Sequence, residues 1–584
     1  MGASLSLSAN GAFGSSLSKF FPKLLDMTAD GLFNPVFDNE EFTKSKERLI
    51  EGIKSDENSV PAAARRVANI LAYGKSHPRS EYPTEKSINN IEFNDIEKFF
   101  KSNFKPNNSY MVVIGDFEFD ATIKQIESLF KKWKKGKVTN SKFLSNPATQ
   151  TAIHFVDMPN AIQSEISFQN LINLKKKDSD YFSLLITNKI LGGGPENRLE
   201  QEIRENKGYT YVARSSFGTS KYLESRFSAF TNTREEVTDS AIVVMLNEIK
   251  KIREFDVETK ELEDVKAKYF GNFVLASERP STIANYAVEI KTESLDRDFY
   301  KNYLSNINSV SVDQVRNTAN KYFDLENGQI IVAGKGSAIA EKLENIVFDG
   351  KKLQVFYYDK YGNTIEKPVF KKEINDDVTV KSIFNKYIDA IGGLDKLNSI
   401  TSISTTAAVT IPGAPFKPNA IMKEKSPNKT SMEMSVPNMG TLMTQKFNGE
   451  DGYIEQMGQK IPYEDEQKKE GKDKKGLFEE VFMETVGSEI ISLSPIDGKD
   501  IYKIKVKENS FRFYDADSGL LIMTEETTKT MGNEIKTITK FSDYRDVDGV
   551  KFAFKREIVT GPQTIVIEAD QIILNEEIPD EFFN

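Results

Sequence analysis

The pattern of apolar and polar positions divides the chain into a first part of mixed helices and strands and a last part built almost only of strands. In the first part, apolar runs at 152–156 and 164–169 predict two strands. The apolar stretch that follows at 181–191 is long enough for a helix, and Gly192 ends it. This alternation predicts a sheet with helices packed against it.

In the last part, nearly every apolar run between 400 and 583 is short and alternating, and turn pairs such as Asp548-Gly549 separate the runs. A single helix precedes these strands, because apolar residues recur on one helical face between 380 and 391. This pattern predicts one antiparallel β domain with one helix. The stretch 464–475 is almost entirely charged and is expected to form a mobile loop.

Two stretches of the first part resemble each other at a nearly constant offset. Phe37 and Phe255 are 218 residues apart, and Gly115 and Gly334 are 219 apart. Such an offset is typical of a duplicated domain, although two ordinary α/β stretches can agree by coincidence. The repeat predicts matching strands at 111–115 and 330–334. It also places the start of the first copy roughly 60–70 residues before the first residue of the chain.

The predicted fold class is therefore α+β, with two tandem α/β-sandwich domains, the first of them incomplete, followed by the antiparallel β domain. The expected boundaries are a first domain at 1–137, a linker at 138–150, a second domain at 151–347, a linker at 348–375 and the β domain at 376–584.

Composition removes several classes of function. The chain has no Cys, which excludes disulfides, thiolate metal sites and Cys nucleophiles. Its only two His residues, His77 and His154, are too far apart to form a helical two-His zinc motif. The formal charge of −9 lacks the clustered basic face of a nucleic-acid binder. No apolar run is long enough to span a membrane.

Arg204 and Tyr211 are the candidate functional residues. Arg204 lies near the end of a short predicted helix at 198–206, and Tyr211 lies in a predicted strand at 209–217. A guanidinium and a phenol brought together across a tight turn can donate to the backbone carbonyls of an extended peptide. The alternative is a solvated Arg and a half-buried Tyr with no such role.

Several motifs together resemble the pitrilysin/insulinase family of zinc metallopeptidases, in particular its processing-peptidase branch. The residues that carry the resemblance are 34–46, Gly115-Asp116, the glycine-rich 191–194, Arg198-Leu199, 203–205 and 207–211. The resemblance covers about residues 2–347. It implies two tandem peptidase-type domains, and it implies that Arg204 and Tyr211, seven residues apart, are the substrate-clamping pair of that family.

The resemblance also implies a zinc site, and this chain departs from it there. The family carries His-x-x-Glu-His on a helix of its first domain and a further Glu ligand downstream. The chain has no such motif, and Gly52 stands where the downstream Glu is expected. Glu51 is one residue out of phase and would point about 100° away around a helix. We therefore expect no catalytic residue, no metal ligand and no cofactor in this chain.

The last domain resembles the periplasmic lipoprotein-carrier half-barrels, in which an antiparallel sheet wraps around a helix and binds acyl chains. Ile391-Gly392-Gly393 and the hairpin sequence at 544–552 carry this likeness, which covers about 376–584. It implies a periplasmic location and a possible acyl or lipid ligand.

Three hypotheses follow. In the first, the chain is a non-catalytic metallopeptidase subunit in which Arg204 and Tyr211 hold a peptide that a zinc-bearing partner of the same family cleaves. In the second, it is a fragment of a complete zinc metalloendopeptidase whose metal motif lies upstream of Met1. In the third, it is a non-enzymatic periplasmic binder of lipid or lipoprotein.

Overall fold

The computed structural model divides the chain into two compact units, 1–368 and 369–584. It describes all residues except 1–2, 9–10, 138–142, 146–147, 195, 413, 415, 438, 457, 484, 497, 531–532 and 561–562. Much of the linker expected at 138–150 therefore lies outside the described residues. Each unit has its own sheet and its own core.

The beginning of the first unit is a hairpin followed by helices. The hairpin strands pair antiparallel, with Ser4 opposite Ser15. Asp38 caps the longest of the helices by accepting a hydrogen bond from the backbone N–H of Glu41 at 2.9 Å. The elements are β1 (Ser4–Ser8), β2 (Gly11–Ser15), α1 (Phe21–Phe33), α2 (Asn39–Asp56), α3 (Val60–Tyr73), α4 (Glu85–Asn89), α5 (Phe93–Asn103) and α6 (Phe119–Phe130).

The strand predicted at 111–115 does not form. These residues are assigned no strand, and the side chains of Met111 and Ile114 are 46% and 45% exposed. A strand needs a neighbour to satisfy its N–H and C=O groups, and among the described residues of this region only the β1–β2 hairpin forms a sheet. Apolar character alone was therefore not sufficient to make a strand here.

The centre of the first unit is a seven-stranded mixed sheet in the order β11-β10-β3-β7-β4-β6-β5. The two strands predicted first, at 152–156 and 164–169, are β3 and β4, and the strand predicted at 330–334 is β7. β10 and β11 lie in the stretch expected to be a linker with one or two strands, and β10 joins the sheet by pairing in parallel with β3. The strands are β3 (Ala152–Asp157), β4 (Ser164–Ile172), β5 (Ala213–Phe217), β6 (Ser225–Thr233), β7 (Gln329–Gly334), β10 (Val355–Tyr358) and β11 (Thr364–Ile365).

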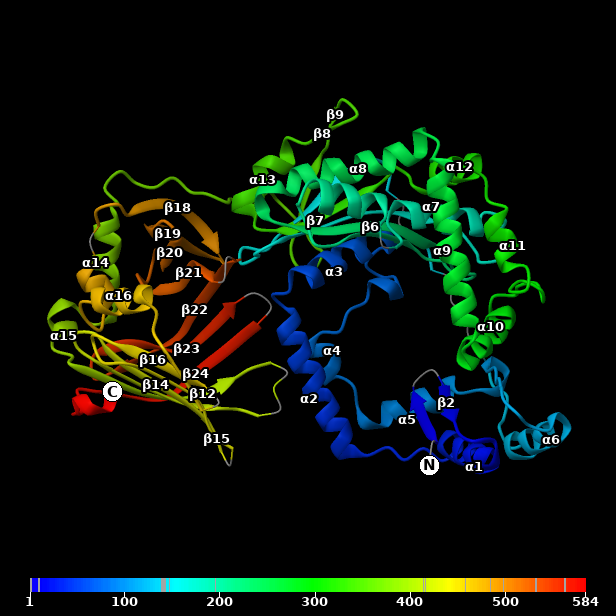
Figure 1. Cartoon of the computed structure of the whole chain (residues 1–584), viewed down its shortest axis with the longest axis horizontal. Helices are drawn as coiled ribbons and strands as arrows, with labels where there is room; N and C mark the ends of the chain where they lie inside the picture. The colour runs from blue at the N-terminus through cyan, green and yellow to red at the C-terminus, as the bar shows by residue number, and fades with distance from the viewer. Residues whose placement is uncertain are drawn as a thin grey trace. The chain divides into compact units, whose positions relative to one another are not determined.

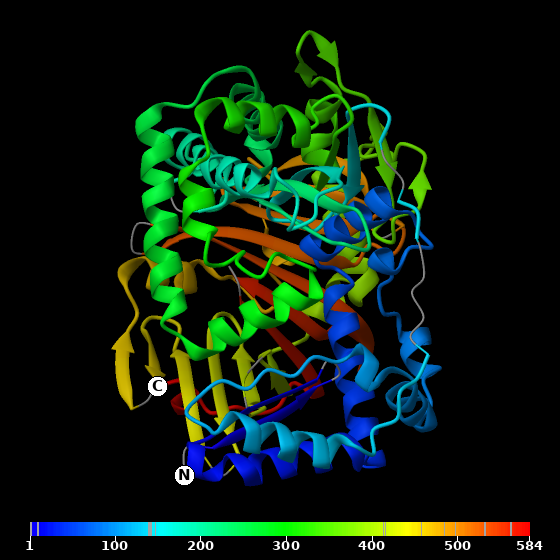
Figure 2. The same ribbon diagram turned by 90° about the vertical axis from the view of Figure 1, so that its right-hand side faces the viewer.

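Helices cover both faces of this sheet (Figures 1 and 2). On one face, α3 packs Ala63 and Val67 against Ile331 and Ala333 of β7. The other face, which carries Phe168 and Phe227, is covered by α7 (Tyr181–Leu191), α8 (Thr238–Glu254), α12 (Val312–Tyr322) and α13 (Gly336–Glu344). The helices α9 (Thr259–Ser277), α10 (Pro280–Thr292) and α11 (Tyr303–Asn308) pack against α7 or against one another.

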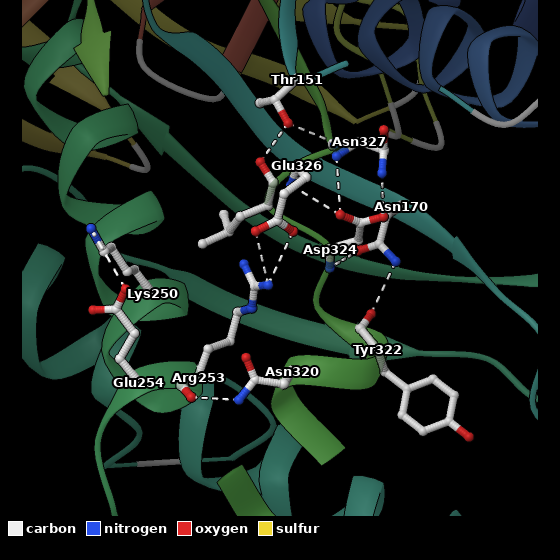
Figure 3. A network of polar contacts seen from close by, with 12 residues as sticks. Thr151, Asn170, Lys250, Arg253, Glu254, Asn320, Tyr322, Asp324, Glu326 and Asn327 are labelled. Carbon is white, nitrogen blue, oxygen red and sulfur yellow. Dashed lines mark hydrogen bonds and ion pairs between the residues drawn. The ribbon is translucent and has the colours of Figure 1, made fainter. Parts of the chain in front are cut away.

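A polar network fixes the turn that leads into the central strand β7 (Figure 3). Asp324 accepts hydrogen bonds from the backbone N–H groups of Glu326 and Asn327 at 2.9 and 3.0 Å. Burial alone would raise the pKa of Asp324, but these bonds and the Asn327 side chain outweigh it and lower the pKa. Glu326 also pairs with Arg253 at the end of α8 at 3.0 Å, so the turn is tied to the helical layer.

The second unit contains one antiparallel sheet of 13 strands. β12 pairs with β24, and this pair joins the earlier strands to the later ones. The strands are β12 (Ser402–Thr410), β13 (Asn419–Lys425), β14 (Lys429–Val436), β15 (Gly440–Phe447), β16 (Gly452–Gln456), β17 (Gln459–Pro462), β18 (Glu489–Ile496), β19 (Lys499–Lys507), β20 (Ser510–Asp515), β21 (Leu521–Thr530), β22 (Asn533–Val547), β23 (Val550–Thr560) and β24 (Gln563–Leu574).

The sheet curves around the helix α14 (Val380–Ile391), which has the bounds that its apolar face predicted (Figure 1). Phe384 packs with Tyr514 and Leu521, and Ile391 packs with residues from the other half of the sheet. The predicted turn at Asp548-Gly549 is confirmed, because both residues have positive φ and join β22 to β23. The antiparallel β domain is thus as predicted, but α14 is not its only helix, since the short helices α15 (Leu394–Asn398), α16 (Asp465–Asp473) and α17 (Glu479–Phe482) also form.

The charged stretch 464–475, expected to be a loop, contains the helix α16 (Asp465–Asp473). Glu464 and Gln467 form a capping box that satisfies backbone N–H groups at its start. Lys468 pairs with Asp451 at 2.9 Å, and Gly471 lies close against the ring of Phe447. Local capping and one close contact therefore hold a helix that has almost no apolar face. No helix among the described residues is long and apolar enough to span a bilayer.

Candidate functional site

Arg204 lies on a short π-helix, Glu200–Asn206, rather than on an ordinary α-helix. The wider turn shows in the backbone, where the N–H of Lys207 donates to the C=O of Glu202, five residues earlier, at 3.2 Å. Gly208 ends the helix with φ +63°, a conformation that glycine adopts without strain. π-helical turns are rare and are frequently found at functional sites.

The start of the π-helix is anchored to the helical layer. Arg198 makes a bidentate ion pair with Glu261 of α9, with N–O distances of 2.9 and 2.6 Å. This pair raises the pKa of Arg198, chiefly through the hydrogen bond to Glu261. Arg198, which belongs to the sequence motif, therefore has a structural partner, and it holds the segment that carries Arg204.

Arg204 itself is partly exposed and held by two carboxylates of its own helix. Its guanidinium is 2.8 Å from Glu200 and 3.4 Å from Glu205, and its side chain is 43% exposed. Guanidinium carries five N–H donors, so these contacts orient it while leaving donors for a further acceptor. The arrangement fits a residue that presents a fixed charge to a bound molecule.

Tyr211 is not in a strand, contrary to the prediction. The strand β5 begins only at Ala213, and Tyr211 lies in the bend before it with its side chain 82% exposed. The side chain of Thr210 explains the late start, because it accepts from the N–H of Val212 at 3.0 Å and so holds the bend. Tyr211 is thus far more exposed than the half-buried alternative requires.

Arg204 and Tyr211 lie on either side of one turn, and the described residues provide no hydrogen bond between them. What they share is a location beside β5, because the π-helix packs against this strand. β5 is the edge of the seven-stranded sheet and pairs only with β6. An edge strand offers unpaired N–H and C=O groups, which an extended polypeptide can use.

The glycine-rich turn after α7 is packed against the start of β5. The N–H of Ser215 donates to the C=O of Gly192 at 2.9 Å. A Cβ at position 192 would lie 2.3 Å from the backbone nitrogen of Ser215, so only glycine allows this approach. The turn thus positions β5, in agreement with the structural role expected of a helix end.

A lysine and an asparagine hold the rest of this turn. Lys189 donates to the C=O of Gly193 at 3.0 Å, and Asn197 donates to the C=O of Gly194. Burial lowers the pKa of Lys189, and the nearby charges of Lys268 and Arg214 lower it further. The carbonyls of Gly192, Gly193 and Gly194 are therefore all bound by neighbouring groups of this chain.

The two His residues do not form a metal site. His77 is buried, stacks on Tyr73, and accepts from the N–H of Arg79 at 3.0 Å. His154 is buried in β3 and has a partner that its sequence context did not indicate, the hydroxyl of Tyr358 at 3.2 Å. No cluster of three or more potential metal ligands occurs in the part of the chain that the structure describes. Glu51 is exposed on α2.

The sequence singled out Arg204 and Tyr211 as candidates but did not indicate the features that set their geometry. The π-helical turn has no signal in the residue pattern, whereas the spacing of Glu200 and Arg204, four residues apart, could have indicated their ion pair. The edge position of β5 depends on the order of strands in the sheet, which the local sequence does not contain.

Comparison with known proteins finds similarity to peptidases and peptidase-like proteins of the M16 family. The model of the family described as "Peptidase M16 inactive domain" matches residues 90–269. The chain is 23% identical over 322 residues to the "Uncharacterized zinc protease YmxG" of Bacillus subtilis, which covers 54% of this chain and 75% of that protein. It is 20% identical over 289 residues to the "Non-peptidase homolog YmxG" of Helicobacter pylori, covering 49% and 65%.

Among solved structures, the peptidase M16 inactive domain from Pseudomonas fluorescens has a similar fold. The TM-score is 0.51 at 21% sequence identity, and the match covers 57% of this chain and 81% of that one. The family-model match at 90–269 contains the edge strand β5, Arg204 and Tyr211.

Proposed function

We propose that this chain, which matches the model of the M16 inactive domain at 90–269, is a non-catalytic subunit that holds an extended peptide for a zinc-bearing partner of the same family. The peptide would lie along β5, with Arg204 and Tyr211 donating to its backbone carbonyls. The observation that carries the proposal is that the exposed Tyr211 and the oriented Arg204 lie beside the same edge strand. The N–H of Ser215 in this strand is already bound to Gly192, so the peptide would pair with the other outward-facing groups of β5.

The chemistry of the two side chains suits this role. Arg204 keeps guanidinium donors free after its contacts with Glu200 and Glu205, and it needs no acceptor in return. The exposed phenol of Tyr211 can donate one further hydrogen bond. Because both groups would bind backbone atoms, this pair would accept many peptide sequences.

Zinc chemistry belongs to the proposed partner and not to the described residues of this chain. The family's zinc site needs imidazole and carboxylate ligands that converge on one ion. Here both His rings are buried in separate places, and the ring of His154 stacks on Phe356. These residues do not fit a zinc site, and we derive no catalytic step from them.

The test measures peptide binding by the purified chain. Anisotropy of a short fluorescein-labelled casein peptide would report affinity for the wild-type chain and for Tyr211→Phe and Arg204→Gln. We expect Tyr211→Phe to weaken binding about two- to tenfold, the effect of one neutral hydrogen bond. Arg204→Gln should weaken it by about tenfold or more, because its hydrogen bonds are charge-assisted.

Two exposed residues outside the site provide matched controls. Tyr222 is 70% exposed, and Arg48 lies on α2 with its side chain 68% exposed. Tyr222→Phe and Arg48→Gln should bind the peptide as the wild-type chain does. If all four variants bind equally well, the assigned role of Arg204 and Tyr211 is wrong.

A further inference from the structure

The face of the seven-stranded sheet that α3 covers carries an unexpected row of polar side chains. In the strand register, Gln329 of β7 lies opposite Gln169 of β4, Gln169 lies opposite Ser228 of β6, and Ser228 lies opposite Ser216 of β5. The sheet face under a helix is normally apolar. A polar row across four strands therefore requires an explanation.

The buried end of the row is a chain of amides with fixed orientation. Gln169 donates to the C=O of Ala68 at 2.7 Å and to the side-chain oxygen of Gln329 at 2.8 Å. Gln329 in turn donates to the C=O of Leu71 at 3.1 Å. Both acceptors are on α3, so the side-chain oxygen of Gln169 is turned toward the remaining neighbour, Arg226.

Arg226 is a half-buried guanidinium whose hydrogen-bond partners are neutral. It donates to Gln169 at 3.1 Å and to the side-chain oxygen of Asn69 at 2.9 Å. Burial lowers the pKa of Arg226, and nearby Arg79 lowers it further. No carboxylate lies within ion-pair distance of it among the described residues. A buried charge without a counter-charge is costly, so a structural arginine is usually paired.

Arg79 places a second positive charge at the same point. It follows α3 and donates to the hydroxyl of Tyr73 at 2.8 Å and to the backbone C=O of Glu224 at 3.1 Å. Its guanidinium also lies over the Tyr73 ring, 5.2 Å from the centroid. Within the part of the chain that the structure describes, the partners of Arg79, like those of Arg226, are neutral.

The two arginines line a pocket of about 510 Å³ between α3, the end of β5 and the start of β6. Hydroxyl groups complete the lining, those of Ser216, Ser228 and Thr219. The hydroxyls of Ser216 and Ser228 are 3.2 Å apart. Of the residues that line the pocket, only the two arginines carry a charge.

We propose that this pocket binds an oxyanion, a carboxylate or phosphate group of a ligand, between Arg79 and Arg226. Guanidinium groups match the planar geometry of carboxylate and phosphate oxygens with paired hydrogen bonds. The serine and threonine hydroxyls supply further donors. The bound anion would provide the counter-charge that Arg226 lacks. This site is separate from the peptide site at Arg204 and Tyr211 and does not depend on it.

Calorimetric titration of the full chain with inorganic phosphate, and separately with glutarate, tests the site. We expect at least one of these anions to bind, and we expect Arg79→Gln to weaken that binding about tenfold or more. Arg79 is exposed, so its substitution should leave the fold intact. Ser228→Ala, a smaller change to the lining, should weaken binding by a few-fold.

The outcomes separate the sources of the anion. Binding of phosphate alone would assign a phosphorylated ligand, and binding of glutarate would assign a carboxylate. Arg48→Gln removes an exposed arginine of α2 that does not line the pocket, so it should not change the affinity for the anion. Absence of binding by both anions, or equal binding by the wild-type chain and Arg79→Gln, would overturn the proposal.

Discussion

The imidazole of His154 should make the first unit less stable in mild acid. The ring lies in β3, 8% exposed, stacked on Phe356 and hydrogen-bonded to Tyr358 at 3.2 Å. Burial lowers its pKa to about 4. In an unfolded chain, the pKa of the same group is about 6.5. The folded state therefore holds His154 neutral at pH values where the unfolded state is protonated.

The sign and size of the effect follow from linkage. Between pH 6.5 and pH 4 the unfolded state binds more protons, so the free energy of unfolding rises with pH. The stabilisation that comes from the neutral His154 is fully present above about pH 6.5, and it is lost as the pH falls toward 4. A difference of about 2.5 pKa units corresponds to about 3.4 kcal/mol in total. Between pH 7.5 and pH 5 the expected loss is about 2 kcal/mol.

The comparison of wild-type chain with His154→Gln isolates this effect. Urea unfolding followed by circular dichroism at several pH values gives the free energy of unfolding for each protein. The difference between them removes the contribution of all other titrating groups. We expect the difference in free energy of unfolding between the two proteins to change by about 2 kcal/mol between pH 7.5 and pH 5. The wild-type chain should lose more stability in acid than the variant.

A second measurement and a control make the test specific. The chain has only two His residues, so the imidazole NMR signals of the folded protein can be assigned with one variant. His77→Gln should leave the part of the pH dependence that comes from His154 unchanged. If the His154 signal titrates near pH 6.5 in the folded protein, or if the stability difference is the same at both pH values, the reasoning from burial is refuted.

Two glycines provide further predictions, both measured by urea unfolding. Gly192→Ala should destabilise the first unit by about 1–3 kcal/mol, because the added Cβ would lie 2.3 Å from the backbone of Ser215. Its matched control is Gly271→Ala in α9, where nothing lies near the added Cβ and helix propensity should stabilise by about 0.5–1 kcal/mol. Gly392→Ala should destabilise the second unit by about 1–3 kcal/mol, because Gly392 has φ +144° and its Cβ would lie 2.7 Å from the C=O of Gly549. Equal stability of wild-type chain and either destabilised variant would contradict these close contacts.

The elements that the sequence predicted well are those whose pattern is local and whose burial is complete. The helix 380–391 has a single apolar stripe, and this stripe is the buried side of the helix. The strand at 152–156 is buried on both of its faces. The prediction at 111–115 was wrong because strand formation depends on a neighbour elsewhere in the chain. The prediction at 464–475 was wrong because capping and a contact with Phe447 are sufficient for a helix without an apolar face.

The two candidate sites also differ in how far the local sequence could predict them. Arg204 and Tyr211 could be found from a motif, because their spacing is local. The polar row that ends at Arg226 could not, since Gln169, Ser228 and Gln329 become neighbours only through strand register and strand order. Read along the chain, each is an ordinary polar residue in a strand.

Arg226 is informative by contrast with three other buried or half-buried arginines of this chain that are paired with acids. Arg198 has Glu261 at 2.6 Å, Arg253 has Glu326 at 3.0 Å, and Arg512 has Glu480. Each of these charges is balanced within the described structure, so each is explained by the fold alone. Arg226 is bound only by amides, and the fold could have satisfied those amides with a neutral side chain. An anion bound between Arg79 and Arg226 would offset the cost of this charge, which a neutral side chain at position 226 would not incur.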